Sequence, residues 1–192
     1  MGLEHEFKWS ARTTKDFDAF LSAVPDAVFA ENAGIYDVYY DNKDKYYSSQ
    51  KMSCRIRRQN GAYILTFKSD TKIVNGLARR EEKNINLKAK NLPDAVKESA
   101  KYLPAKGIKK IFSIKNKRKN YALKNDFEAE VSFDDCVIKA GKKTARMFEI
   151  EMEFKHGDEK KFNNFAKNLT KKTGLKFAEV SKVKTAISLL RS

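Results

Sequence analysis

The stretch Phe148-Glu149-Ile150-Glu151-Met152-Glu153-Phe154 alternates large apolar and acidic residues without a break. Successive side chains of a β-strand point to opposite faces, so a strand here places three glutamates on one face and the apolar residues on the other. The same alternation occurs in Glu4–Trp9, where Glu4, Glu6 and Lys8 share a face. Both stretches therefore predict strands with one apolar and one charged face.

Alternation predicts eight strands, at residues 3–9, 35–41, 53–59, 62–69, 77–87, 110–123, 127–135 and 145–155. Helical spacing is found at about 15–24, after Pro93, at 162–169 and at 183–190. Hairpin links between neighbouring strands, with Asn60-Gly61 as a strong turn signal, favour closure of the sheet. We therefore expect an α+β, mainly β fold, an eight-stranded antiparallel closed barrel with flanking helices and a helical C-terminal tail.

Length and composition fit one domain. The chain has 192 residues, of which 41% are hydrophobic and 11% aromatic, enough to bury a core. No Gly/Ser-rich or Pro-rich linker and no internal repeat divides it. We expect a single domain over 1–192, strand-rich over 1–156 and helical over 157–192.

The charge balance limits the classes of partner and metal site. Forty Lys and Arg against 25 Asp and Glu give a net charge of +15, which predicts an anionic partner. Two cysteines and two histidines are too few for a disulfide framework or for a Cys-rich or His-rich metal site, so any metal would be held by carboxylates. With no apolar run of spanning length and no leader after Met1, we expect a cytoplasmic protein without a membrane partner.

Charge is also sorted by strand. Arg55 and Arg57 share a face, as do Thr66 and Lys68, so the middle strands are basic while the first and last two are acidic. For any single strand, a solvated face explains such a pattern. The whole set indicates more, because barrel closure would join carboxylates that hold a metal with cations that hold phosphate.

The order of the motifs resembles the CYTH, or triphosphate tunnel metalloenzyme, superfamily. The motifs that carry the resemblance are Glu4-x-Glu6-x-Lys8, Tyr39-Tyr40-Asp41, Cys54-Arg55-Ile56-Arg57, Leu65-Thr66-Phe67-Lys68, Arg79–Lys83, Lys117-Arg118, Glu130 and Glu149-Ile150-Glu151. It is close over about residues 1–155 and looser through Ser181-Lys182. The resemblance implies an eight-stranded barrel around a hydrophilic tunnel, which acts on triphosphates with Mg²⁺ or Mn²⁺.

Carried over residue by residue, the resemblance implies three sets of site residues. The metal ligands are Glu4, Glu6, Glu149 and Glu151. The triphosphate-binding residues are Lys8, Arg55, Arg57, Lys68, Arg79, Lys117, Arg118 and Lys182. The catalytic residues are Glu130, Glu151 and Lys8.

Three departures from the family pattern bear on these sets. Where many relatives have Arg-x-Glu-x-Glu, Arg79–Lys83 places a lysine at the second acid, and Ser132 replaces a frequent carboxylate. Lys117 and Arg118 are adjacent, so a regular strand cannot turn both inward. Arg118 aligns more naturally with microbial relatives. Fewer acids weaken the case for a second metal.

The function expected first is metal-dependent hydrolysis of inorganic tripolyphosphate to pyrophosphate and phosphate. The alternatives are a thiamine triphosphatase, a class IV adenylate cyclase that makes cyclic AMP and pyrophosphate from ATP, and a non-enzymatic binder of polyphosphate or nucleic acid. The basic runs lack any known nucleic-acid-binding fingerprint, so we expect a small-molecule triphosphate and no nucleic acid as partner. A homodimer is left open. His5, Cys54 and Cys136 are expected to be structural rather than nucleophilic.

Overall fold

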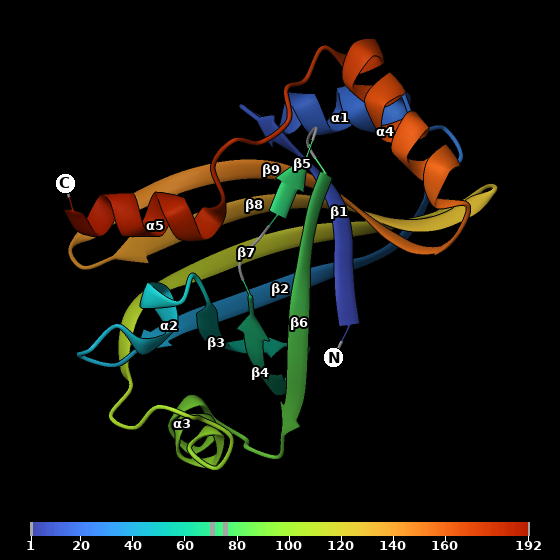
Figure 1. Ribbon diagram of the computed structural model, residues 1–192. Coiled ribbons are helices and arrows are strands. Elements are labelled where there is room, and N and C mark those ends of the chain that lie inside the picture. The colour runs from blue at the N-terminus through green and yellow to red at the C-terminus, as the bar shows by residue number, and fades with distance from the viewer. Residues whose placement is uncertain (1, 70–71, 75–76, 192) are drawn as a thin grey trace.

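A computed structural model describes residues 2–69, 72–74 and 77–191. The strands follow the order β1-β9-β8-β7-β2-β3-β4-β6, and β6 pairs with β1, which closes an eight-stranded antiparallel barrel (Figure 1). Their bounds are Gly2–Ala11 for β1, Val28–Asp41 for β2, Ser53–Gln59 for β3, Ala62–Lys68 for β4, Leu77–Leu87 for β6, Lys109–Lys124 for β7, Phe127–Ala140 for β8 and Lys143–Gly157 for β9. The predicted closed barrel is confirmed.

The differences from prediction are short elements and strand ends. β2 begins at Val28 rather than at 35, because its first half pairs with β7 across a bulge between Phe29 and Glu31 that breaks the alternation. β5 (Lys72–Val74) and α2 (Tyr46–Ser49) are additional elements. Neither is long enough to show a period in the sequence.

The longer helices begin and end at the signals that the sequence carries. Their bounds are Thr14–Ser22 for α1, Leu92–Ser99 for α3, Glu159–Thr173 for α4 and Lys182–Arg191 for α5. Thr13 caps α1 in a capping box with Asp16. Asp158 caps α4, and Gly174 ends it in the left-handed conformation with a φ of 69°.

The hydrophobic core lies largely outside the barrel, between the strands and the helices (Figure 1). One cluster fills the space between β1, β8, β9 and the pair α1 and α4, and includes Trp9, Phe20 and Phe162. A second joins β2, β3 and β4 to α2 and α3, around Ile56 and Leu65. Because the apolar faces of most strands point outward to these helices, their charged faces point into the barrel. β7 differs, since Lys115, Lys117 and Lys119 lie on its outer face and Ile114 lies inside.

One end of the barrel interior is narrowed by α5. Its buried Ala186 packs with Ile114 of β7 and Ile138 of β8, which lie on the inward faces of their strands. Ser181, at the beginning of this segment, and Val183 also line the interior cavity. The interior is therefore apolar only at the α5 end. None of the helices in the described residues has the length and hydropathy that a membrane crossing would require.

Candidate active site

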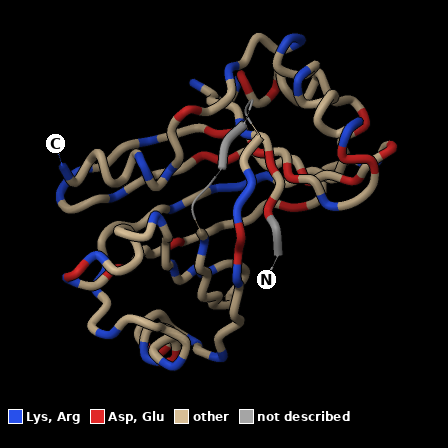
Figure 2. The backbone as a smooth tube through the Cα atoms, in the orientation of Figure 1, with Lys and Arg blue, Asp and Glu red and all other residues tan. Residues whose placement is uncertain are grey.

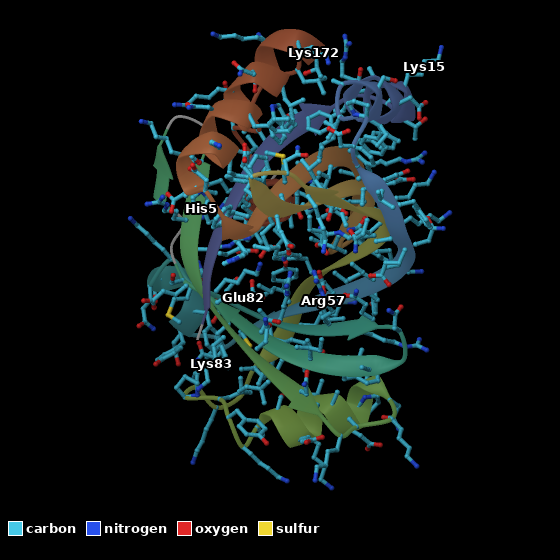
Figure 3. The ribbon with its side chains drawn as sticks, turned by 90° about the vertical axis from the view of Figure 1, so that its right-hand side faces the viewer. His5, Lys15, Arg57, Glu82, Lys83 and Lys172 are labelled. Carbon is cyan, nitrogen blue, oxygen red and sulfur yellow. The ribbon has the colours of Figure 1, made fainter. Side chains whose placement is uncertain are left out.

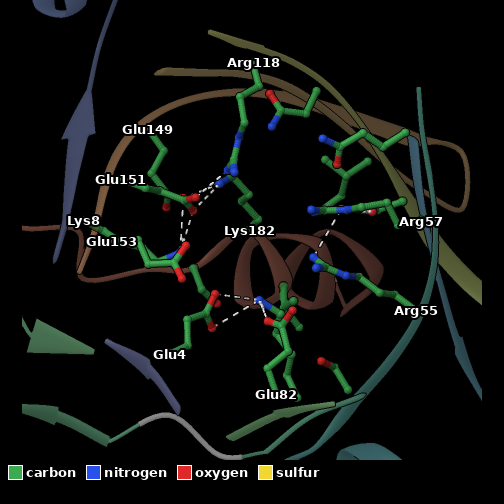
Figure 4. A pocket seen from close by; sticks show the side chains of 18 of the residues that line it. Glu4, Lys8, Arg55, Arg57, Glu82, Arg118, Glu149, Glu151, Glu153 and Lys182 are labelled. Carbon is green, nitrogen blue, oxygen red and sulfur yellow. Dashed lines mark hydrogen bonds and ion pairs between the residues drawn. The ribbon is translucent and has the colours of Figure 1, made fainter. Parts of the chain in front are cut away.

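The barrel encloses a cavity of about 620 Å³. Of the described residues that line it, eight are Lys or Arg and eight are Asp or Glu. Figure 4 shows them pointing at one another across the interior, with Arg55 and Arg57 on one side and Glu149 and Glu151 on the other. The charged faces that alternation defines along each strand thus meet in one enclosed space.

Two arginines of β3 share one carboxylate. Asp37 of β2 stands opposite Arg57 and accepts hydrogen bonds from Arg57 Nε and Nη2, both at 2.8 Å. Arg55 Nη1 donates to Asp37 at 3.4 Å, while Arg55 Nε is buried without a hydrogen-bond partner among the described residues. Burial opposes the ionisation of Asp37, yet Arg55 and Arg57 lower its pKa to about 2. The two guanidiniums are held in place but only partly neutralised.

Lys68 of β4 lies among both signs of charge. Its Nζ is 3.0 Å from Glu4 Oε1 and 2.5 Å from Glu82 Oε2, and Arg80 also donates to Glu4. Burial, together with the neighbouring charges of Arg55 and Arg80, lowers the pKa of Lys68 to about 8. An anionic ligand beside this buried ammonium would favour its charged form.

Three buried carboxylates meet beside the start of α5. Asp134 of β8 and Glu149 and Glu151 of β9 each offer one oxygen, and these oxygens lie within 4.8 Å of one another. Lys182 donates to all three, at 2.7 Å to Asp134 and 2.8 Å to Glu151. Arg118 donates to both oxygens of Asp134 at 2.6 Å and also to Glu151. The acidic cluster is therefore neutralised by cations of two other elements.

Lys8 connects this cluster to the glutamates of β1. Its Nζ lies 2.6 Å from Glu151 Oε1 and 3.1 Å from Glu6 Oε1. Arg80 Nη2 donates to Glu6 at 3.0 Å. Burial alone would lower the pKa of Lys8, but the carboxylates of Glu151, Glu6 and Glu149 raise it above its ordinary value. Lys8 therefore stays charged and fixed between two acidic groups.

The acidic cluster fits a divalent cation. Its donors are carboxylate oxygens, which Mg²⁺ and Mn²⁺ prefer. Burial raises the pKa of Glu149 to about 7 even though Lys182 and Lys8 are close. Glu149 Oε1 is buried and has no hydrogen-bond partner among the described residues. A carboxylate oxygen in that position would gain from a cationic ligand.

Most of the predicted site residues meet in this cavity. Those that line it are Glu4, Lys8, Arg55, Arg57, Lys68, Arg118, Glu130, Glu149, Glu151 and Lys182. Glu6 is buried beside Lys8. Glu130 lies opposite Glu153 in the register, about 13 Å along β8 from Asp134 at the usual strand rise.

Two predicted phosphate ligands lie outside the barrel. Arg79 forms an ion pair with Glu159 of α4, and its neighbour Arg80 points inward instead. Lys117 is exposed on the outer face of β7, and Arg118 is the inward member of that pair. On β6 a shift of one residue, which moves every side chain of a strand to the other face, separates the expectation from the structure. On β7 the inward residue is Arg118, the one favoured from the sequence.

The family motif on β6 is accordingly displaced by one position. The inward residues are Arg80, Glu82 and Asn84, so Asn84 rather than Lys83 replaces the second acid of Arg-x-Glu-x-Glu. In Figure 3, Glu82 points into the space that the strands enclose and Lys83 lies outside it. Lys83 therefore does not enter the cavity.

Asp37, Arg80 and Asp134 are site residues that the sequence did not single out. Asp134 is four residues from Glu130 on β8, so alternation places both side chains on the same face. Asp37 is related to Tyr39 on β2 in the same way. These spacings are a signal from which the two residues could have been predicted. Arg80 carried no such signal, because it lies in a run of charges without apolar neighbours of clear parity.

The chain is similar to proteins of known activity and known structure. An inorganic triphosphatase of Haemophilus influenzae is 31% identical over 159 residues, which cover 80% of this chain and 45% of the relative. The chain thus spans less than half the length of this curated relative.

Two solved structures share the fold. A putative adenylyl cyclase from Hippeastrum, described as having a dominant triphosphatase activity, matches with a TM-score of 0.69 and 15% identity over 96% of this chain and 95% of that one. A protein of Pyrococcus horikoshii OT3 matches with a TM-score of 0.67 and 19% identity over 97% of this chain and 99% of that one. The family model of the CYTH domain matches residues 2–187. The chain therefore belongs to the CYTH domain family.

Proposed function

We propose that the protein is a metal-dependent triphosphatase that hydrolyses inorganic tripolyphosphate to pyrophosphate and phosphate inside the barrel. The observation that carries the proposal is the pairing of an incompletely neutralised cationic wall with a buried carboxylate cluster in one cavity. Such a cavity suits a polyanion and a divalent cation together. Membership of the family and the triphosphatase relative support the same conclusion.

The cationic wall is proposed to bind the phosphoryl groups. Arg55 offers a buried Nε that has no protein partner in the described chain, and Arg57 is oriented by Asp37. Arginine binds phosphoryl oxygens through two donors at once, while Lys68 acts as a point charge. These side chains would fix the chain of phosphates along the wall and offset the charge of the group being transferred.

The metal is proposed to bind Asp134, Glu149 and Glu151, with Glu4 and Glu6 of β1 as further ligands. A divalent cation held there would act as a Lewis acid that stabilises negative charge on the phosphoryl groups. Lys182 and Lys8 form ion pairs with the same carboxylates. Once the metal neutralises these carboxylates, both lysines would be free to bind phosphate. Glu130, whose carboxylate borders the cavity apart from this cluster, would orient the attacking water.

Tripolyphosphate is favoured over organic triphosphates because the cavity offers little apolar surface. Among the described residues that line it, the apolar ones are Tyr39, Ile114 and Val183, all near α5. A thiamine or adenine ring needs an apolar or aromatic surface, whereas tripolyphosphate needs charges alone. The wall composition therefore predicts the simplest triphosphate as substrate.

Phosphate release from tripolyphosphate tests the proposal, measured with Mg²⁺, with Mn²⁺ and with EDTA. ATP and thiamine triphosphate are run alongside, and pyrophosphate is measured as well as phosphate. We expect rapid metal-dependent release from tripolyphosphate. Pyrophosphate and cyclic AMP from ATP would instead identify a cyclase, and no product from any substrate would indicate a protein that only binds.

Matched variants locate the chemistry. Glu6→Gln removes a buried carboxylate beside Lys8 and is expected to lower turnover by about 100-fold or more. The control is Glu81→Gln, an exposed glutamate on the outer face of β6. Arg80→Ala is expected to weaken substrate binding and turnover together, and Arg79→Ala to change neither. Full metal-dependent activity in Glu6→Gln would show that the site is wrongly assigned.

A further inference from the structure

The outer surface of the barrel is only partly covered by helices along β2 and β7, where α1 borders one end. Two cavities, of about 410 and 720 Å³, lie there and share Gly34, Lys117 and Asp135. We call them together the outer groove. Gly34 contributes no side chain, and a Cβ placed on it would meet nothing within 4 Å, so the groove stays open where the two cavities join. Apart from Asn116 and Arg118, which border both spaces, the residues that line the outer groove do not line the interior cavity.

The outer groove is rich in cations. Lys115, Lys117 and Lys119 alternate along β7, where basic positions recur in Figure 2, and alternate residues of a strand stand about 7 Å apart. Arg58 of β3 joins them across the sheet. Within the described chain, Lys115, Lys119 and Arg58 form no ion pair. Asp135, one of two acids in the groove, is already bonded to Arg146. The groove thus carries a positive surplus that faces solvent.

Aromatic and apolar side chains accompany these cations. Phe29, with 51% of its surface exposed, contacts Tyr121 edge to face at a ring-centre distance of 5.6 Å. Tyr36 is half-buried and stands between Arg58 and Lys115 in the register of β3, β2 and β7. Aromatic rings therefore lie at both ends of a row of lysines.

We propose that the outer groove binds single-stranded nucleic acid, as a second site separate from the triphosphate cavity. Single strands are held by a basic groove that follows the backbone and by aromatic rings on which bases stack. Inorganic polyphosphate has no bases and would gain nothing from Phe29 and Tyr36. The expectation of no nucleic-acid partner rested on missing sequence fingerprints. The register of β7 with β2 places the lysines on one face beside aromatic residues of β2.

The test is the binding of fluorescent oligo(U) and oligo(dT) of about 12 nucleotides, measured by anisotropy over a range of salt concentrations. The variant Lys115→Gln/Lys117→Gln/Lys119→Gln should lose affinity and reduce the slope of log K against log salt by roughly 2, since each phosphate contact contributes about 0.7 on single strands. The control variant Lys90→Gln/Lys97→Gln/Lys101→Gln removes the same charge beside α3, which packs on the opposite wall. It should keep nearly all of the wild-type slope.

A second pair of variants tests stacking. Phe29→Ala should weaken binding by roughly 5- to 150-fold without a change of salt slope, because loss of one stacked base costs that much. Tyr102→Ala removes another exposed aromatic residue, after α3, and should leave affinity unchanged. Thermal melts establish that each variant is folded.

Three results would overturn the proposal. The first is an equal loss of affinity in the groove and control lysine variants. The second is wild-type affinity in Phe29→Ala. The third is that inorganic polyphosphate of matched charge competes as well as unlabelled oligo(U) does. Either of the last two would show a purely electrostatic surface. A stronger response to oligo(U) than to oligo(dT), or the reverse, identifies the class of strand.

Discussion

The buried charge pair at Asp37 allows a direct test of how the cationic wall is held. We predict that Asp37→Asn destabilises the protein and that tripolyphosphate restores much of the loss. Asparagine has nearly the shape of aspartate but no charge, so Arg57 and Arg55 would be left in the interior without their counter-ion. An anionic ligand on the same guanidiniums would replace that charge.

The magnitude follows from the burial of the pair. Asp37 is 5% exposed and accepts two hydrogen bonds of 2.8 Å from Arg57. Removal of one partner of a buried ion pair lowers the free energy of unfolding by about 3–5 kcal/mol. Because asparagine keeps one hydrogen-bond acceptor, we expect a loss at the lower end of this range, about 3 kcal/mol. At about 2–4 °C per kcal/mol for a chain of this length, the melting temperature falls by roughly 6–12 °C. The folded-state pKa of about 2 means that this stability is present above pH 4 and is lost as the pH falls toward 2.

The measurement is thermal unfolding at neutral pH with and without tripolyphosphate. Asp135→Asn is the matched control, since Asp135 accepts the same two 2.8 Å bonds from an arginine, Arg146, whose side chain is 60% exposed. Exposed pairs contribute about 0–1 kcal/mol, so the control should lose less than about 4 °C. Equal losses in the two variants would refute the argument from burial. An Asp37→Asn protein that tripolyphosphate does not stabilise would refute the role of the arginines in binding.

Three further predictions concern other parts of the site and the fold. Tripolyphosphate should bind less tightly as the pH rises above about 8, because Lys68 loses its proton there, and calorimetry of Lys68→Arg should not show this dependence. Lys182→Met should lower the free energy of unfolding by about 3–5 kcal/mol, since three buried carboxylates lose a shared cation, and Mg²⁺ should raise the melting temperature more in this variant than in the wild type. Gly157→Ala should cost about 2 kcal/mol or more in denaturant unfolding, because φ is 100° and a Cβ would lie 2.7 Å from backbone atoms, whereas Gly61→Ala, with open space at φ 80°, should cost about 1 kcal/mol.

The barrel was predictable because its strands have one apolar and one charged face. Stretches such as Phe148–Phe154 fix which residues share a face, and closure follows from the number of strands and their hairpin links. The core then lies under helices whose apolar spacing, at 162–169 and 183–190, the sequence also shows. What alternation cannot supply is the position of short elements such as α2, whose backbone amides donate to the side chains of Asp41 and Asn42 just before it.

The site was predictable wherever an apolar residue marks the parity of the strand. Ile56 separates Arg55 from Arg57, and Ile150 separates Glu149 from Glu151. Each pair therefore shares one face of its strand, and all four side chains line the cavity. Between Arg79 and Lys83 every residue is charged, and nothing local says which of them face inward. Only the pairing of β6 with β1 and β4 decides it. Cross-strand partners such as Asp37 and Arg57 likewise depend on a register that the sequence does not state.

The net charge of the chain had suggested an anionic ligand, but the structure places that surplus outside the cavity. Acidic and basic residues that line the cavity are equal in number, so it contributes nothing to the +15 of the whole chain. The proposed binding of a triphosphate in the interior therefore depends on the arrangement of its charges, with arginines on one wall and carboxylates on another, and not on an excess of one sign. The excess lies on outward-facing residues, including the lysines of β7. The proposed substrate site in the cavity therefore leaves the surface charge unexplained, and a second anionic ligand on the outside of the barrel would account for part of it.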